Sequence, residues 1–267
     1  MKLISFGSGS CGNCYYIESD GRGVIIDAGI GIRKLKKYFG DYGVNPGAIE
    51  AVLVTHDHAD HVKSVGMLSA AYGLPVYATA RVHEGIRRNY CVRRKVDPAC
   101  VRTVEPGAPF AVAGLTVEPF AVPHDSLDNV GYKITAGTVT LSLITDAGCV
   151  TPVMAEAVAA ADYLIIESNY DEAMLWAGRY PVSLKRRVAG GDGHLSNGQC
   201  AAAVAAYASD RLRHVWLCHL SADNNRPDVA LAAVRAALAA SGRPGLASLP
   251  VDVMRRGVAG PVYELGA

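Results

Sequence analysis

Three histidines and two aspartates lie within seven residues of one segment, THDHADH at positions 55–61. His56 and His58 stand two residues apart, so in an extended segment their side chains point the same way and can hold one metal ion. Asp60 and His61 follow at the expected turn into a helix and can hold a second metal beside the first. Neutral imidazole and carboxylate suit zinc and neighbouring first-row metals. A solvated polar loop or helix cap is the alternative, and the spacing disfavours it.

Three more candidate ligands each follow an apolar run that predicts a β-strand. His124 follows FAVP, Asp146 follows LSLIT and His219 follows VWLC. Loops at strand ends are where a rigid sheet delivers functional groups. One such histidine is more often a plain surface residue, but four strand ends that all lead into His or Asp are harder to explain in that way. The sequence therefore predicts one site assembled from four strand ends.

The elements that must position these residues alternate between strands and helices. Strands are expected at Lys2–Phe6, Cys14–Glu18, Gly23–Asp27, Ile49–Thr55, Pro75–Ala78, Tyr163–Glu167 and His214–Cys218, with a β-rich block over Val101–Thr145. Helices are expected from Pro152 and at Ile32–Phe39, Val62–Tyr72, Thr79–Arg88, Asp171–Ala177, Val182–Val188, Asn197–Tyr207 and Pro227–Ala240. Two β-rich blocks flanked by helices predict two packed sheets with helices on their outer faces. No stretch resembles a linker, so residues 1–267 are expected to form a single domain.

Composition and charge exclude several classes of protein. Half of the 267 residues are apolar and 19% are charged, which excludes a disordered chain. A net charge of +1 disfavours a strongly basic protein that wraps nucleic acid, while a local basic patch is compatible with it. No run approaches the roughly 18 apolar residues of a membrane helix, and no export signal is expected. Seven dispersed cysteines then fit reduced thiols in the cytoplasm, and no obligate protein partner is inferred.

The ordered set of motifs resembles the metallo-β-lactamase superfamily over nearly the whole chain. The resemblance implies an α/β fold, a four-layer αββα sandwich, with two divalent metal ions, Zn²⁺ or Mn²⁺, at one sheet edge. By motif, seven side chains are the implied ligands: His56, His58 and His124 for the first metal, Asp60, His61 and His219 for the second, and Asp146 as the bridge. A binuclear site of this kind clamps a hydroxide between metals about 3.5–4 Å apart and lowers its pKa towards neutrality.

Four further segments resemble one group of this superfamily, the WalJ/YycJ group: GSGSCGNC at 7–14, ESNYDEAML at 167–175, GHLSN at 193–197 and HLSADNN at 219–225. That group is associated with 5′-to-3′ exonuclease activity, which implies a DNA substrate. His58 stands where redox di-iron flavoprotein members carry Glu, and true β-lactamases lack a bridging residue like Asp146. The chain is also too short for the inserted cap domain of the RNA-processing β-CASP enzymes.

The GHLSN segment is also similar to the His-Ser-Thr motif of tRNA 3′-processing and cyclic-phosphate phosphodiesterase relatives. There the equivalent histidine contacts the scissile phosphate and can protonate the leaving oxygen. By that match His194 is the general-acid candidate, with a helix-cap role as the alternative. Asp60 is expected to act in catalysis as well as in metal binding. Candidate substrate contacts are Ser196, Asn197, Asn224, Asn225 and Arg179; candidate supports for ligand imidazoles are Asp125 and Glu167.

Basic clusters occur at 33–37, 87–88, 93–95 and 185–187. Most such runs are solvated faces, but an exonuclease needs several phosphate contacts, and Arg179 and Lys185–Arg187 are the first candidates for a DNA track. Trp176 and Tyr180 are candidates for base stacking, with packing as the more common role. The sequence thus predicts a metal-dependent phosphodiesterase that releases nucleotides from DNA 5′ ends. A hydrolase of small esters, thioesters or cyclic phosphodiesters with the same fold, and a binding module with a structural metal, are the alternatives.

Overall fold

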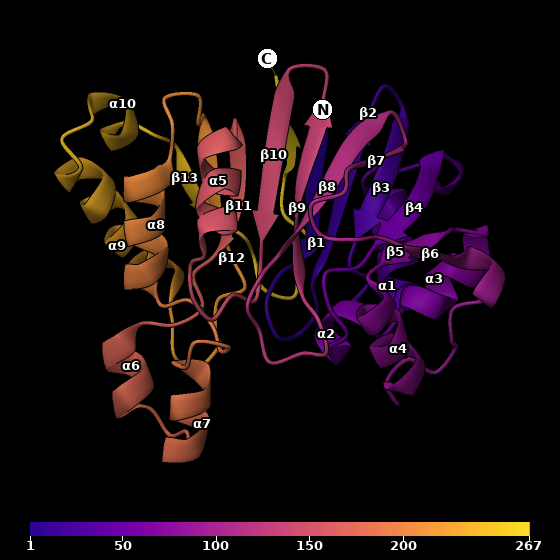
Figure 1. The fold of residues 1–267 in the computed structure, drawn as a ribbon, viewed down its shortest axis with the longest axis horizontal. Helices are drawn as coiled ribbons and strands as arrows, with labels where there is room; N and C mark the ends of the chain where they lie inside the picture. The colour runs from indigo at the N-terminus through magenta and orange to yellow at the C-terminus, as the bar shows by residue number, and fades with distance from the viewer. Residues whose placement is uncertain (267) are drawn as a thin grey trace.

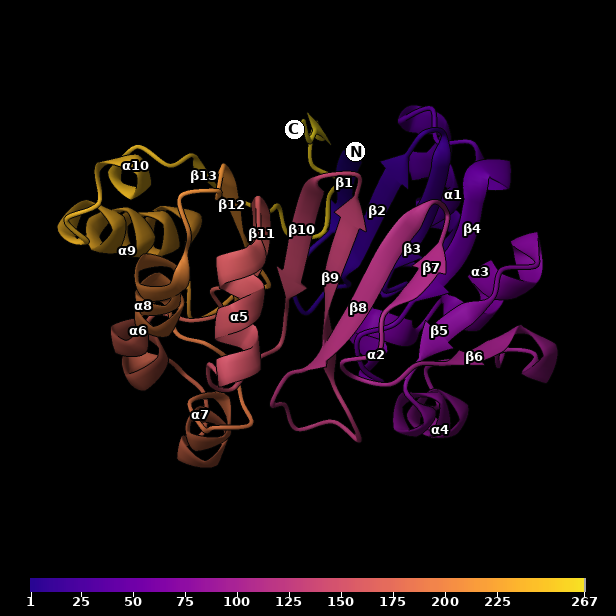
Figure 2. The same cartoon turned by 45° about the horizontal axis from the view of Figure 1, so that its top comes forward.

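Two seven-stranded sheets lie face to face, and helices cover both outer faces (Figures 1 and 2). The computed structural model describes residues 1–266. The arrangement is the four-layer αββα sandwich that the sequence predicts. None of the helices within these residues is both long and apolar enough to cross a membrane.

The first sheet has the strand order β14-β1-β2-β3-β4-β5-β6. Its strands are β1 (Lys2–Gly7), β2 (Cys14–Ser19), β3 (Arg22–Ile26), β4 (Ile49–Leu53), β5 (Val76–Ala78), β6 (Val101–Thr103) and β14 (Val262–Glu264). The pairs β3–β4, β4–β5 and β5–β6 are parallel, whereas β14–β1, β1–β2 and β2–β3 are antiparallel. The carboxyl ends of β3 and β4 therefore meet at one edge of this sheet.

The second sheet has the order β13-β12-β11-β10-β9-β8-β7. Its strands are β7 (Phe110–Val112), β8 (Leu115–Ala121), β9 (Val130–Ala136), β10 (Val139–Ile144), β11 (Tyr163–Glu167), β12 (His214–Cys218) and β13 (Val251–Val253). An antiparallel meander from β7 to β10 continues into parallel pairs from β10 to β13. Strands β8, β10, β11 and β12 consequently run in one direction, and their carboxyl ends share an edge.

Side chains of neighbouring residues on a strand belong to different core layers. Leu3 and Tyr15 pack between the sheets, whereas Ile4 and Tyr16 pack beneath the helices of the first sheet. Both faces of each sheet are covered, so its inner strands read as continuous apolar runs rather than as alternating patterns. Trp216, fully buried, belongs to the layer between the sheets.

Helices α1 (Ile32–Asp41), α2 (Ala59–Val62), α3 (Val65–Tyr72) and α4 (Ala80–Arg88) cover the first sheet. Helices α5 (Pro152–Ala160), α8 (Asn197–Tyr207), α9 (Pro227–Ala240) and α10 (Pro244–Ala247) cover the second. Helices α6 (Glu172–Ala177) and α7 (Val182–Val188) extend beyond the sheets at the lower left of Figure 1. Short 3₁₀ turns lie at Pro46–Ala48 and Pro98–Cys100.

Two features differ from the sequence expectation. The helix predicted at Val62–Tyr72 is divided into α2 and α3, because the Ser64 amide donates to the Ala28 carbonyl after β3 instead of continuing the helix. Strands β13 and β14 and helix α10 were not anticipated. The two strands are three residues each, and pairing with β12 and β1 rather than local propensity defines them.

Candidate metal centre

All seven predicted ligand side chains meet at the edge where the strands of both sheets end. Three overlapping groups among them have candidate ligand atoms within 4.8 Å of one another: His56, His58 and His124; His56, His61 and Asp146; and Asp60, His61 and His219. A fourth group joins Asp146 and His219 to Glu167 and His194. The first sheet contributes the ligands of segment 56–61, and the second contributes His124, Asp146 and His219. The cluster therefore lies across the seam between the two sheets.

Sharp turns at strand ends aim several of these side chains. Asp27, Asp146 and His219 follow closely after β3, β10 and β12, and their φ angles are 59°, 53° and 53°. Such left-handed backbone is uncommon for residues other than glycine, although Asp and His tolerate it better than most. Conformations of this kind concentrate at functional sites, where the surrounding structure holds them in place.

The residues fit divalent metal ions. His56 is completely buried, and its Nε2 atom has no hydrogen-bond partner among the described residues. Leaving a buried nitrogen unpaired is costly, so its presence calls for a ligand. The donors around it are imidazole nitrogens and carboxylate oxygens, a set that suits zinc, manganese and related metals. Metal ions at this cluster would give the His56 nitrogen the partner it lacks.

Buried acceptors orient the ligand imidazoles. The Nδ1 atom of His61 donates to Asp27 at 2.7 Å, and Asp27 also accepts from the amide and hydroxyl of Thr55 at 2.9 Å each. The Nδ1 atom of His219 lies 2.9 Å from a carboxylate oxygen of Glu167. Each contact engages Nδ1 and turns Nε2 towards the cluster, where in this structure the Asn13 amide lies 2.8 Å from Nε2 of His61. Outer partners of this kind fix the tautomer of a ligand. Glu167, predicted to support a ligand imidazole, thus contacts the ring of His219.

Asp125 occupies a different position from the one expected. The Nδ1 atom of His124 donates to the Gly193 carbonyl at 2.9 Å, so a backbone oxygen orients this ring. The Asp125 carboxylate instead lies 3.4 Å from Nε2 of His124 and forms an ion pair with Arg187. Asp125 therefore lies at the rim of the cluster. The sequence gives no signal that the Gly193 carbonyl, 69 positions away, orients the ring of His124.

The charges within the cluster compensate one another. Burial lowers the pKa of His56 well below its usual value, which favours the neutral form that binds metal. Burial alone would raise the pKa of Asp146, but His219 and His61 outweigh it and hold that pKa well below its usual range. Burial opposes the charge on His219 too, yet Asp146, Asp60 and Glu167 raise its pKa to about 10. The carboxylates thus make the centre attractive to positive charge.

His194 lies at the margin of the cluster. Its ring centroid is 5.0 Å from that of His124 and 5.4 Å from that of His219. Its Nδ1 atom donates to Glu167 at 2.8 Å, and its side chain is 19% exposed. Burial lowers its pKa, but Glu167 and Asp146 outweigh burial and raise it above the usual value. A partly exposed histidine that lies beside the ligands and is protonated more readily than usual can donate a proton.

Four of the five candidate substrate contacts are buried and make internal contacts. Ser196 caps α8 together with Gln199, and Asn224 approaches the Ser221 hydroxyl at 3.4 Å. The side chains of Asn197 and Asn225 bond to each other at 2.8 and 2.9 Å. We therefore assign these four residues to the support of the site loops rather than to substrate.

The fifth candidate, Arg179, is exposed, and no ion pair involves it within residues 1–266. Two of the other basic candidates for the expected DNA track already have partners within the protein. Lys185 is buried and donates to the Trp176 carbonyl at 2.6 Å, while Arg187 is paired with Asp125. The Tyr180 hydroxyl donates to Asp223 at 3.0 Å, and Trp176 is 51% exposed.

Sequence reasoning missed several supports of the ligands. Asp27 follows the apolar run GVII, the same signal that marks Asp146, and could have been found in that way. The glycine-rich segment carries two others: the Ser8 hydroxyl accepts from the His219 amide at 2.9 Å, and the Asn13 amide lies 2.8 Å from Nε2 of His61. Asn169 donates to the His219 carbonyl at 2.8 Å. These three residues lie in the segments 7–14 and 167–175, which resemble family motifs, but their residue types alone do not indicate that they contact ligands.

Two sheets with a histidine and carboxylate cluster at their shared edge define a hydrolase of the metallo-β-lactamase fold. Residues 22–219 match the Beta-lactamase superfamily domain, and the chain belongs to this family. It is a metal-dependent hydrolase.

Named relatives cover most of the chain. It is 34% identical over 235 residues to exodeoxyribonuclease YycJ of Bacillus anthracis, covering 88% of each chain. It is 32% identical over 230 residues to exodeoxyribonuclease WalJ of Streptococcus pneumoniae, covering 86% of this chain and 85% of that one. The crystal structure of YhfI from Bacillus subtilis, a metallo-β-lactamase fold protein, superposes with a TM-score of 0.72 at 20% identity, covering 98% and 99% of the two chains.

Proposed function

We propose that the chain is a DNA exonuclease that releases nucleotides from 5′ ends at a centre of two metal ions, Zn²⁺ or Mn²⁺. The observation that carries the proposal is the position of His194, which shares the Glu167 carboxylate with the ligand His219. This arrangement supports the cleavage of a bond whose leaving oxygen must gain a proton. Exodeoxyribonuclease relatives at 32% and 34% identity support DNA as the substrate.

The seven proposed ligands are His56, His58, Asp60, His61, His124, Asp146 and His219. Metal ions bound by them supply a water of lowered pKa as nucleophile and positive charge beside the phosphate oxygens. Asp27 and Glu167 keep the ligand rings in the tautomer that binds metal. Asp60 lies at the seam between the sheets, with a carboxylate oxygen 3.6 Å from Nε2 of His61 and 3.4 Å from Nε2 of His219, and in this proposal it acts on the nucleophile as well as on the metals.

Glu167 and His194 supply the proton that the leaving oxygen takes up. Glu167 accepts a hydrogen bond from Nδ1 of His194, so Nε2 of the same ring carries the proton that is donated. Glu167 is itself completely buried and accepts from the amides of Ala147 and Leu195, at 2.8 and 3.1 Å. With the contacts to His194 and His219 and a longer one from Asn169, five contacts on one carboxylate fix its position, and this fixes the direction of the His194 ring.

The test is a digestion time course on duplex DNA labelled at either the 5′ or the 3′ end, with Mn²⁺ or Zn²⁺ supplied. Early release of 5′-labelled mononucleotide, while the 3′-labelled strand shortens stepwise, is the expected result. Stepwise loss of the 3′ label would contradict the direction. Absence of cleavage by protein with measured bound metal would contradict the nuclease assignment and favour a small-ester or cyclic-phosphodiester hydrolase.

A further inference from the structure

A second basic surface lies beside the metal centre, on α4 and the loop that follows it. Residues 81–95 contain six Lys or Arg and one acidic residue, Glu84, although the whole chain is nearly neutral. Glu84 pairs with Arg88. Arg87, Arg93 and Arg94 are exposed, and within residues 1–266 no carboxylate lies within ion-pair distance of them. The charge of these three arginines is therefore available to an anion.

An exposed aromatic ring lies among these arginines. Tyr90 is 90% exposed, the most exposed large apolar side chain among the described residues. A single exposed ring needs no explanation by itself. A ring with arginines on both sides along the chain, however, is the combination with which proteins bind single-stranded nucleic acid: cations follow the backbone and the ring stacks on a base.

The loop is fixed to the metal-binding segment. The Asn89 side chain donates to the Asp57 carbonyl at 2.7 Å, and Asp57 lies between the ligands His56 and His58. Lys95 donates to the carbonyl of Asn89 at 2.7 Å and to that of Ile86 at 3.4 Å, which ties the far end of the loop to α4. Figures 1 and 2 show α4 next to α2 at the end of the sheets where the ligands meet. The arginines and Tyr90 are thus held close to the centre.

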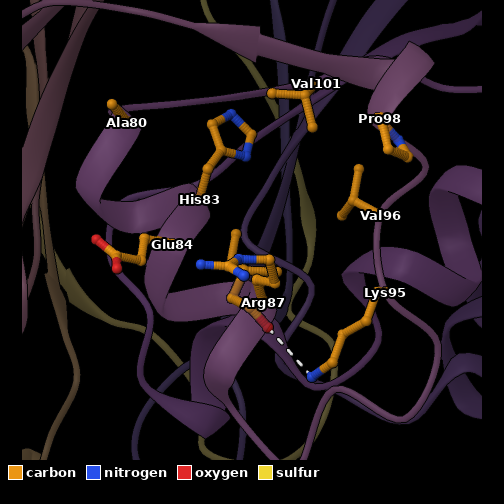
Figure 3. Close-up of a pocket in the computed structure, with 9 residues that line it drawn as sticks. Ala80, His83, Glu84, Arg87, Lys95, Val96, Pro98 and Val101 are labelled. Atoms are coloured by element: carbon orange, nitrogen blue, oxygen red, sulfur yellow. Dashed lines mark hydrogen bonds between the residues drawn. The ribbon is translucent and has the colours of Figure 1, made fainter.

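A cavity is lined by α4 and the segment that follows it. Figure 3 shows Arg87 on α4 beside Lys95 of the following loop, with His83, Val96 and Val101 also lining the cavity. Its volume is about 410 Å³. His83 approaches the Arg102 carbonyl at 3.0 Å, and Lys95 is held by carbonyls, so neither is free for a phosphate. Of the cations lining the cavity, Arg87 is the one available for binding.

The opposite flank of the centre offers less free charge. On that flank Lys185 is buried against a carbonyl and Arg187 is paired with Asp125, which leaves two exposed arginines, Arg179 and Arg186, outside any ion pair among the described residues. The α4 side therefore presents the larger set of unpaired cations next to the centre.

We infer that Arg87, Tyr90, Arg93 and Arg94, here called the α4 surface, bind single-stranded DNA next to the metal centre. The arginines contact successive phosphates and Tyr90 stacks on an unpaired base. This inference rests on the proposed function for the choice of DNA. It implies that the strand is unpaired where it leaves the centre on this side.

The test measures binding apart from cleavage. A fluorescein-labelled 20-nucleotide single strand with a phosphorothioate backbone is titrated with the metal-loaded protein from 50 to 200 mM salt, and its length is checked afterwards on a gel. We expect Arg93→Ala and Arg94→Ala each to weaken binding and to reduce the slope of log affinity against log salt by about 0.7, one phosphate contact each. Arg235→Ala, at an exposed arginine of α9 in the helical layer on the second sheet, is the matched control.

Tyr90 is tested separately from the charges. Tyr90→Ala is expected to weaken binding of the single strand about 5- to 100-fold with an unchanged salt slope, and Tyr90→Phe to restore it, since stacking needs only the ring. Tyr207→Ala is the control because Tyr207 is 46% exposed at the end of α8. An equal loss of affinity for duplex DNA would overturn stacking on an unpaired base. Tighter binding of RNA of the same sequence would overturn DNA as the ligand.

The outcomes separate this inference from the proposed function. Wild-type affinity in the combined Arg93→Ala and Arg94→Ala variant would overturn the α4 surface, whether or not the protein cleaves DNA. Loss of affinity in that variant, in a protein that binds but does not cleave DNA, would support the surface while contradicting the exonuclease assignment.

Discussion

His194 is the residue on which turnover should depend while metal binding does not. We expect His194→Ala to retain its metal content while turnover on DNA falls about 10²- to 10⁴-fold, the usual contribution of a positioned general acid. Metal is measured by mass spectrometry on the sample that is assayed. His214→Ala is the control, since His214 pairs with Asp252 at the opposite end of β12. Full turnover of the His194 variant would remove this residue from the mechanism.

Asp27 is expected to control metal affinity without touching a metal. Asp27→Asn keeps the size of the side chain but removes the carboxylate that accepts the His61 Nδ1 proton. Loss of such an outer partner weakens metal binding about 10- to 100-fold. Competition with a chelator of known affinity measures the change, and Asp41→Asn on the surface of α1 is the control. Unchanged affinity would show that Thr55 and the backbone suffice to orient His61.

The part of the site that could be predicted from the sequence is the part whose residues are neighbours along the chain. The spacing of His56, His58 and His61 is visible because seven neighbouring residues carry it. The partnership of His61 with Asp27 spans 34 positions and depends on the pairing of β3 with β4. The sequence predicts substrate contacts at Asn197 and Asn225 because it shows that these residues are polar but not that they are buried.

At the scale of elements, the contact between α4 and the metal-binding segment depends on the absence of a side chain at Gly85. A Cβ atom there would clash with the Asp57 carboxylate. Gly85→Ala should therefore lower the free energy of unfolding and metal affinity together. Gly40→Ala in α1 is the matched control, because its Cβ meets no atom within 4 Å, and it should stabilise by about 0.5–1 kcal/mol. Urea unfolding of both variants measures the contrast, and equal effects would contradict this account.

Long elements could be predicted from their patterns, while short ones could not. Helix α9 was expected with its observed bounds because fourteen residues repeat an apolar face. Strand β14 has three residues and exists because it pairs with β1, at the other end of the sequence. The division between α2 and α3 likewise comes from a hydrogen bond to the loop after β3.

At the scale of the whole molecule, the ligands join the two sheets, so metal binding should stabilise the entire fold. At a free metal concentration 100 times the dissociation constant, one site adds about 2.7 kcal/mol to the free energy of unfolding. We expect a chelator to lower the melting temperature, and added Zn²⁺ or Mn²⁺ to restore it. Asp146→Ala should melt at the same temperature with and without metal. A metal-dependent rise that persists in this variant would place the stabilising metal elsewhere.

The left-handed backbone at Asp27, Asp146 and His219 limits how this protein can evolve. A residue in a sparsely populated backbone conformation costs about 1–3 kcal/mol. Glycine would relieve this strain at each of the three positions. Each replacement would also remove a ligand or the support of one. Selection for a more robust fold and selection for activity therefore act in opposite directions at these three positions. Substitutions that raise thermal tolerance in the lineage must accumulate elsewhere, in the helical layers and the surface loops.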